Sequence, residues 1–257
     1  MKLIVMINNK GGVGKTTSAV NIAAWLAKMG EKTLLVDLDP SASASIHLGF
    51  EKVKNNHQTL CDFIINGGSD LTSYIYPSII DKLDCLPSEP ALGEFYDDMQ
   101  QETEAEFFLD KKKIPAGYRF VIFDSPPNMG NLAMNALAIA DYVLIPVQTQ
   151  YLALSGLELT LKLIDKAQRH LNNQLKILGV FGTHYDRRTN VAKEVYQILQ
   201  DKFGSLVFDT VIGVNSKLIE AYHAQKPIML YSASARGSKE YKQLTKEIHK
   251  RIKKADG

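Results

Sequence analysis

Residues 10–17 read Lys10-Gly11-Gly12-Val13-Gly14-Lys15-Thr16-Thr17, and this stretch decides the fold. An apolar run, Leu3-Ile4-Val5-Met6-Ile7, comes before it and predicts a buried parallel strand. Residues 18–29 come after it and predict a helix. A glycine-rich loop between a strand and a helix is the context that a phosphate-binding loop requires.

Each part of this loop has a task at a phosphate group. The glycines allow backbone N–H groups to turn inward and approach phosphate oxygens closely. The helix that follows adds unpaired N–H groups and the positive end of its dipole. Lys15 can reach the β- and γ-phosphates, and the hydroxyl of Thr16 can ligate Mg²⁺. The predicted nucleotide-binding residues of the loop are Lys10, Gly11, Gly12, Val13, Gly14, Lys15, Thr16 and Thr17.

The loop departs from the general pattern G-x-x-x-x-G-K-[ST] at its first position, which is Asn9. A second lysine, Lys10, opens the loop instead, and it cannot easily serve the phosphate that Lys15 serves. A loop of the form K-G-G-V-G-K-T-T resembles the deviant Walker A motif of the ParA/Soj/MinD family of ATPases. The resemblance implies that the cofactors are ATP and Mg²⁺. It also implies a homodimer in which Lys10 reaches across to the partner's nucleotide.

Length and composition are those of an ordinary globular protein. The chain has 257 residues, of which 45% are hydrophobic and 23% are charged. Its net charge of +2 is too small to argue for nucleic acid by itself. No apolar run approaches the ~18 residues that a membrane helix needs. Cys61 and Cys85 have no metal or redox spacing and suit a reducing cytosol.

Strand and helix patterns alternate to the end of the chain. They predict an α/β fold with one doubly wound, mostly parallel sheet flanked by helices, and residues 1–257 form a single P-loop ATPase domain in this interpretation. Further strands are expected at residues 33–38, 82–86, 118–124, 140–148, 175–182 and 206–212. Further helices are expected at residues 59–65, 91–113, 131–140, 153–164, 190–203, 216–224 and 238–254. Residues 41–45 and 125–130 have the composition of switch segments.

Carboxylates follow or end two of these predicted strands. Asp37 and Asp39 lie at the end of one, and Asp124 ends another, which is where ligands bind in parallel sheets. Asp124 has the Walker B position, so it can hold Mg²⁺ through water. The D-x-D-P sequence is similar to the family's second motif, which implies that Asp39 orients or activates the attacking water. Asp37 then holds either the Mg²⁺ shell or the switch loop. The predicted catalytic residues are Lys10, Lys15 and Asp39, and the predicted metal ligands are Thr16, Asp124 and Asp37.

The resemblance covers nearly the whole chain and is closest to the short, Soj-like ParA proteins. A MinD-like protein would end in a membrane-targeting helix, whereas the apolar residues at positions 241–252 are expected to pack onto the core. Cys61 and Cys85 do not fit the cluster of a nitrogenase iron protein. A larger ParA would carry an N-terminal helix-turn-helix domain, so this chain is not expected to read an operator sequence.

ParA-like proteins bind double-stranded DNA non-specifically as ATP dimers, through basic residues late in the chain. The candidates here are Arg187, Arg188, Lys193, Lys217, Lys226, Arg236 and Lys239. The family often has Pro-Arg-Asn where this chain has Gly213-Val214-Asn215. Asn215 matches and could contact adenine. The missing arginine removes one expected DNA contact, which Lys217 or the Arg187–Arg188 pair can replace.

The resemblance therefore implies a cytoplasmic, nucleoid-associated partition ATPase with a ParB-like partner that stimulates hydrolysis and releases the protein from DNA. Two alternatives stay open. One is a ParA-like ATPase that positions another cargo, such as a chemotaxis array or a microcompartment. The other is a membrane-surface ATPase of the MinD kind.

Overall fold

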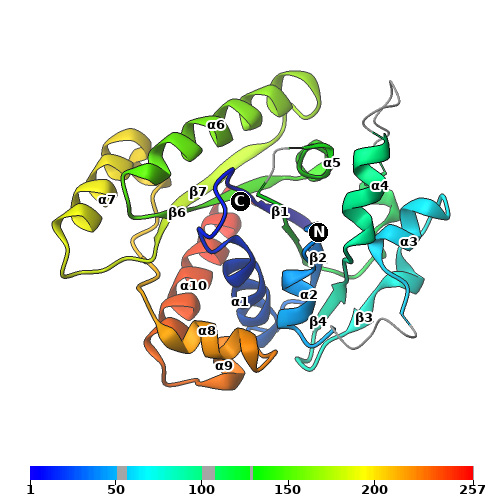
Figure 1. The fold of residues 1–257 in the computed structure, drawn as a ribbon, viewed down its shortest axis with the longest axis horizontal. Helices are drawn as coiled ribbons and strands as arrows, with labels where there is room; N and C mark the ends of the chain where they lie inside the picture. Colours follow the sequence, from blue (N-terminus) through cyan, green and yellow to red (C-terminus); the bar gives the residue numbers. More distant parts are fainter. Residues whose placement is uncertain (51–56, 100–107, 128–129, 257) are drawn as a thin grey trace.

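Seven strands form one sheet in the order β3-β4-β2-β5-β1-β6-β7 in the computed structural model (Figure 1). The structure describes residues 1–50, 57–99, 108–127 and 130–256. All neighbouring strands pair in parallel except β3 and β4, which are antiparallel. The predicted mostly parallel sheet is confirmed. The strands are Lys2–Met6 (β1), Thr33–Asp37 (β2), Tyr76–Pro77 (β3), Leu83–Leu86 (β4), Phe120–Asp124 (β5), Tyr142–Gln148 (β6) and Lys176–Thr183 (β7).

Helices cover both faces of this sheet, as the predicted doubly wound fold requires (Figure 1). Three of the short segments between them are 3₁₀ turns, at residues 72–74, 111–113 and 204–206. The helices are Lys15–Lys28 (α1), Ser43–His47 (α2), Leu60–Ile65 (α3), Ala91–Met99 (α4), Asn131–Ile139 (α5), Leu152–His170 (α6), Asn190–Phe203 (α7), Ser216–His223 (α8), Ile228–Tyr231 (α9) and Arg236–Asp256 (α10).

The two faces of the sheet carry separate hydrophobic cores, because successive side chains of a strand point to opposite faces. Leu3 and Val5 of β1 belong to the core that includes residues of α5 and α6. Ile4 and Met6 belong to the core that includes residues of α1 and α10. Burial on both faces explains why β1 is a continuous apolar run. The C-terminal ends of the parallel strands consequently form one edge, which the site occupies.

Residues 206–212, predicted as a strand, do not join the sheet. Val207 forms only an isolated bridge with β7. The guanidinium of Arg251 donates to the carbonyl oxygens of Leu206 and Val207, at 2.8 Å each, and lies over the ring of Phe208. The apolar composition of the segment therefore reflects burial against α10. Its N–H groups at Phe208 and Ile212 donate to carbonyl oxygens of β7, whereas Arg251 takes the carbonyls of Leu206 and Val207, so no continuous ladder forms.

Within the helix predicted over residues 91–113, the structure describes α4 over Ala91–Met99, and residues 100–107 lie outside the described part of the chain. Phe108 and Leu109 are not helical, because their N–H groups donate to the side-chain oxygen of Asn135 in α5. Of the predicted switch segment 125–130, positions 128 and 129 also lie outside the described residues.

Candidate functional site

The glycine-rich loop joins β1 to α1 at the C-terminal edge of the sheet. Gly12 and Gly14 have φ angles of 73° and 86°, a conformation that strains residues with a Cβ atom. Gly14 is the N-cap of α1, so the first turn of the helix begins inside the loop. Its unpaired N–H groups and positive dipole end are available to an anion at this point.

Helix α6 holds the first half of the loop in place. The N–H of Asn9, which stands where the general pattern has glycine, donates to Thr160 Oγ1 at 3.0 Å. Gly156 lies against Lys10, because a Cβ atom added at Gly156 would be 3.2 Å from the Lys10 Cβ. The Lys10 ammonium lies 3.4 Å from Gln148 Oε1 at the end of β6. The loop is therefore anchored to α6 through a backbone N–H, a group that a glycine at position 9 would offer equally.

Lys15 lies inside the loop, with only 6% of the residue exposed. Its ammonium donates to the carbonyl oxygens of Asn8 (3.0 Å) and Lys10 (3.1 Å). Burial lowers the pKa of Lys15, and the negative charges of Asp124 and Asp39 act in the opposite direction. The two lysines of the motif thus have different surroundings. Lys15 is enclosed by the loop, whereas Lys10 is half-buried with its ammonium beside Gln148 of β6.

The carboxylate of Asp124 is buried beside this loop, and neither of its oxygens has a hydrogen-bond partner within the described residues. Burial raises the pKa of Asp124 well above its usual range, followed by the charge of Asp37 on the next strand, while Thr16 and Lys15 lower it. A buried carboxylate that protein donors leave largely uncompensated suits a hard divalent cation, which prefers oxygen ligands. Mg²⁺ therefore fits here, with Asp124 and Thr16 as the residues that would hold it.

Asp37 is also fully buried, but its oxygens have protein partners. One oxygen accepts from the N–H of Asp39 at 3.1 Å, and the other accepts from the N–H (2.8 Å) and hydroxyl (2.7 Å) of Ser45. Burial raises the pKa of Asp37 to about 6. These bonds hold residues 39–45, which include the start of α2, in place beside β2. Holding this segment is one of the two roles that the resemblance implied for Asp37. Direct metal ligation by Asp37 stays a prediction.

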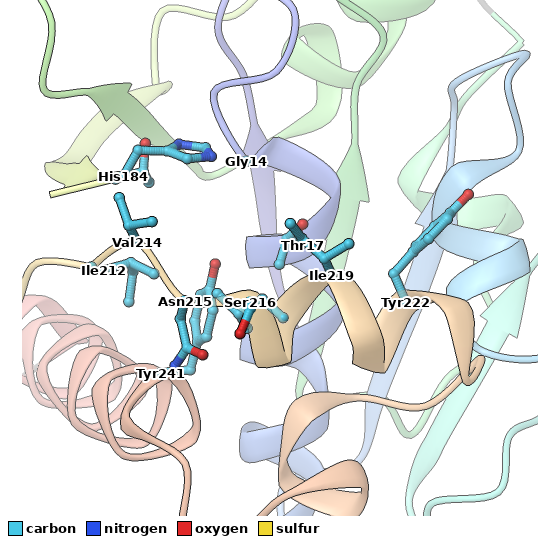
Figure 2. A pocket seen from close by; sticks show the side chains of 13 residues that line it. Gly14, Thr17, His184, Ile212, Val214, Asn215, Ser216, Ile219, Tyr222 and Tyr241 are labelled. Carbon is cyan, nitrogen blue, oxygen red and sulfur yellow. The ribbon is translucent and has the colours of Figure 1, made fainter. Parts of the chain in front are cut away.

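Two adjoining cavities open at the loop. The first, the loop cavity, has a volume of about 350 Å³, and Asp39 lines it together with the glycines, Lys15 and Thr16. The second, the α8 cavity, has a volume of about 380 Å³ and extends toward Asn215 at the start of α8 (Figure 2). An elongated ligand could place a triphosphate in the first and a base in the second. Asn215 lies where a base-binding residue would, and its contact with adenine stays a prediction.

Two residues that the sequence analysis did not select line both cavities, namely His184 and Tyr222. His184 directly follows β7, and the end of a parallel strand is a signal that could have found it. Tyr222 lies inside α8, where the sequence carries no such signal.

The candidate DNA-binding residues fall into two groups. Three of them already have partners, since Arg188 pairs with Asp186, Lys217 with Glu220 and Arg236 with Glu240. The others are exposed and have no ion-pair partner among the residues that the structure describes; they are Arg187, Lys193, Lys226 and Lys239.

Comparison with known proteins agrees with this geometry. A family model described as an AAA domain matches residues 1–177. The chromosome-partitioning ATPase Soj of Treponema pallidum is 39% identical, over 96% of each chain. The sporulation initiation inhibitor protein Soj of Bacillus subtilis is 38% identical over 96% of this chain and 98% of its own length.

Two solved structures have the same fold. Cobyrinic acid a,c-diamide synthase from Mycobacterium smegmatis, with a bound ATP analog and magnesium, matches with a TM-score of 0.83 and 25% identity, over 99% of this chain and 97% of its own. The septum site-determining protein MinD from Pyrococcus horikoshii, complexed with Mg-ADP, matches with a TM-score of 0.74 and 21% identity. The match covers 98% of this chain and 97% of the MinD chain.

The fold and the loop define a P-loop ATPase that uses ATP and Mg²⁺. More particularly, the chain belongs to the Soj/ParA family of partition ATPases. Among the described residues, no helix has the length and apolar composition that a membrane span requires.

Asp124→Asn is expected to stabilise the nucleotide-free protein at pH 7, by about 1 kcal/mol or more, while weakening Mg²⁺-dependent ATP binding. The pKa of Asp124 is raised in the folded state, so the folded protein resists losing this proton. The wild type therefore loses stability as the pH rises from below the pKa of an aspartate in the unfolded chain toward neutrality. Asparagine carries no such charge, so the stability that the variant gains over the wild type should grow as the pH rises. Urea unfolding at pH 4 and pH 7 measures this, and an equal gain at both values would contradict it.

Proposed function

We propose that this chain is a DNA-partition ATPase that works as an ATP-dependent homodimer. Its 257 residues act as one ATPase domain that binds DNA non-specifically in the ATP state. A ParB-like partner then stimulates hydrolysis and releases the protein from DNA, so that the protein is cytoplasmic and nucleoid-associated. The observation that carries the proposal is the second lysine of the loop, Lys10, which lies apart from Lys15 and beside Gln148 next to the loop cavity, in a chain similar to Soj over nearly its full length.

The surface around Lys10 supports a dimer that closes over the nucleotide. Gly156 of α6 packs on Lys10, and residues 3 and 4 positions away lie on the same side of a helix. Leu152 and Leu159 occupy those positions and are 78% and 49% exposed. An apolar surface beside the cleft would be covered when two copies meet there. Lys10 would then act on the partner's nucleotide and stabilise charge in the transition state, in the manner of an arginine finger.

The four basic residues that have no ion-pair partner in the described part of the chain support DNA binding, because such a lysine or arginine breaks no ion pair when it meets a phosphate. Their expected role is phosphate contact, which carries no sequence information. Binding should therefore weaken with salt and be equal for unrelated DNA sequences.

The test is DNA binding by the purified protein without nucleotide, with ADP and with ATP, at several salt concentrations and on two unrelated sequences. Light scattering follows the oligomeric state in parallel. ATP-dependent binding of equal strength to both sequences, appearing together with the dimer, is the expected result. No DNA binding in any nucleotide state would overturn the proposal and leave the ATPase site intact.

Lys193→Glu is expected to weaken this binding on both DNA sequences alike and to reduce the slope of log affinity against log salt by about 1. The reason is that one phosphate contact and its released counterion are lost. Lys166→Glu on α6 is the matched control, because Lys166 is also an exposed helix lysine but is not a candidate contact. If both variants bound DNA like the wild type, Lys193 would not contact phosphate.

A further inference from the structure

His184 has an unusual backbone conformation at a defined place. It is the first residue after β7, and its φ angle is 50°, in the left-handed region that few residues other than glycine adopt. The next residue is fixed by a bond from the N–H of Tyr185 to the carbonyl oxygen of Ile212, at 3.0 Å. The hydroxyl of Thr149 lies 3.4 Å from the carbonyl oxygen of His184. Strain that the surroundings hold in place is typical of functional positions.

This conformation places the imidazole at the nucleotide cleft. The preceding residue, Thr183, donates its hydroxyl to the carbonyl oxygen of Val13 at 2.8 Å, which ties the end of β7 to the glycine-rich loop. Figure 2 shows the His184 ring directed toward the loop at Gly14. The ring makes no hydrogen bond to any residue that the structure describes, so its N–H is available to a ligand.

The junction between the two cavities identifies which part of a nucleotide lies there. The loop cavity surrounds Lys15, which reaches the β- and γ-phosphates. The α8 cavity leads away from the loop toward Asn215. The residues that line both are Gly14, Thr17, His184 and Tyr222. A nucleotide that spans both cavities would place the base-proximal end of its phosphate chain between them.

The charge state of the ring suits a donor. The surrounding protein and then the positive charge of Lys10 lower the pKa of His184, which favours the neutral ring. A neutral imidazole has one N–H donor and one acceptor nitrogen. It can therefore bond to a phosphate oxygen without adding a charge beside Lys10.

We propose that His184 is a nucleotide-contacting residue whose imidazole N–H donates to a phosphate oxygen at the base-proximal end of the phosphate chain of ATP or ADP. This inference rests on the ATP site and not on DNA binding. ATP and ADP share that end of the chain, so His184 contributes equally to the binding of both. Residues that face the γ-phosphate would instead contribute to the binding of ATP and not of ADP.

The test compares His184→Gly with His184→Asn, with fluorescent ATP and ADP analogues as probes. Glycine adopts the same φ without strain and lacks the ring, whereas asparagine tolerates this conformation and keeps a side-chain N–H. The glycine variant is expected to bind both analogues about tenfold more weakly, the loss of one hydrogen bond to a charged group. The asparagine variant should recover most of this loss.

Lys82→Gly is the matched control, because Lys82 also has a positive φ, of 65°, and lies at the opposite edge of the sheet before β4. It should bind both analogues like the wild type. Equal affinities of the wild type and His184→Gly would overturn the role of His184. A loss for ATP alone would overturn the base-proximal contact. If the wild type bound neither analogue, the ATP site itself would be wrong.

Discussion

Lys15→Ala is expected to abolish measurable ATP binding, with a loss of at least about 100-fold. In the nucleotide-free structure the Lys15 ammonium donates to the carbonyl oxygens of Asn8 and Lys10, inside the loop. A bound triphosphate offers that ammonium charged acceptors in a place from which water is largely excluded, where such bonds are strong. Alanine leaves the phosphates with the backbone N–H groups alone.

Isothermal titration calorimetry with ATP and Mg²⁺ measures this loss. Lys28→Ala is the control, because Lys28 ends the same helix and is exposed at a distance from the loop. It should bind ATP normally. The Lys15 variant should remain folded, since burial already lowers the pKa of this lysine and its removal takes a poorly solvated charge out of the loop. An affinity within threefold of the wild type would show that the loop does not use Lys15.

Asp39→Ala is expected to reduce ATP hydrolysis by about 10²–10⁴-fold while ATP binding is retained. Asp39 lines the loop cavity, and one of its oxygens accepts from the N–H of Ser41 at 2.9 Å. Its other oxygen can face an attacking water in the cavity, whereas Asp37 uses both of its oxygens to hold residues 39–45. Under the proposed function, the variant would be trapped as an ATP dimer that still binds DNA.

Asp39→Asn separates this chemistry from the shape of the loop. Asparagine keeps an oxygen for the N–H of Ser41, so the turn is preserved, but it cannot accept a proton from water. Both variants should therefore fail in single-turnover hydrolysis. Normal hydrolysis by the alanine variant would remove Asp39 from the mechanism. Normal hydrolysis by asparagine alone would leave it only a structural role.

Features that depend on neighbouring residues could be predicted from the sequence. The β1–loop–α1 unit is one continuous stretch whose apolar residues, glycines and Lys15 carry the signal locally. The parallel sheet followed in the same way from alternating patterns. Asp37 and Asp124 end adjacent strands because both close apolar runs at the same edge of the sheet. The Soj/ParA resemblance rested on these same local motifs.

Features that depend on partners far away in the sequence could not be predicted from the sequence. Residues 206–212 look like a strand, and only the position of Arg251 shows that a side chain takes the carbonyl groups of Leu206 and Val207. The composition of the late basic residues does not reveal that Arg188, Lys217 and Arg236 are already paired.

The sequence by itself determined that this protein is a P-loop ATPase of the Soj/ParA family, because its motifs and their order lie in contiguous stretches. Only the tertiary structure decided that Asp37 is committed to Ser45 and that His184 stands between the two cavities. The physical reason is that each of these roles depends on where the chain folds back: over eight residues from Asp37 to Ser45, and between β7 and the glycine-rich loop at His184. A hydrogen-bond partner or a shared cavity depends on spatial position, which residue order does not state.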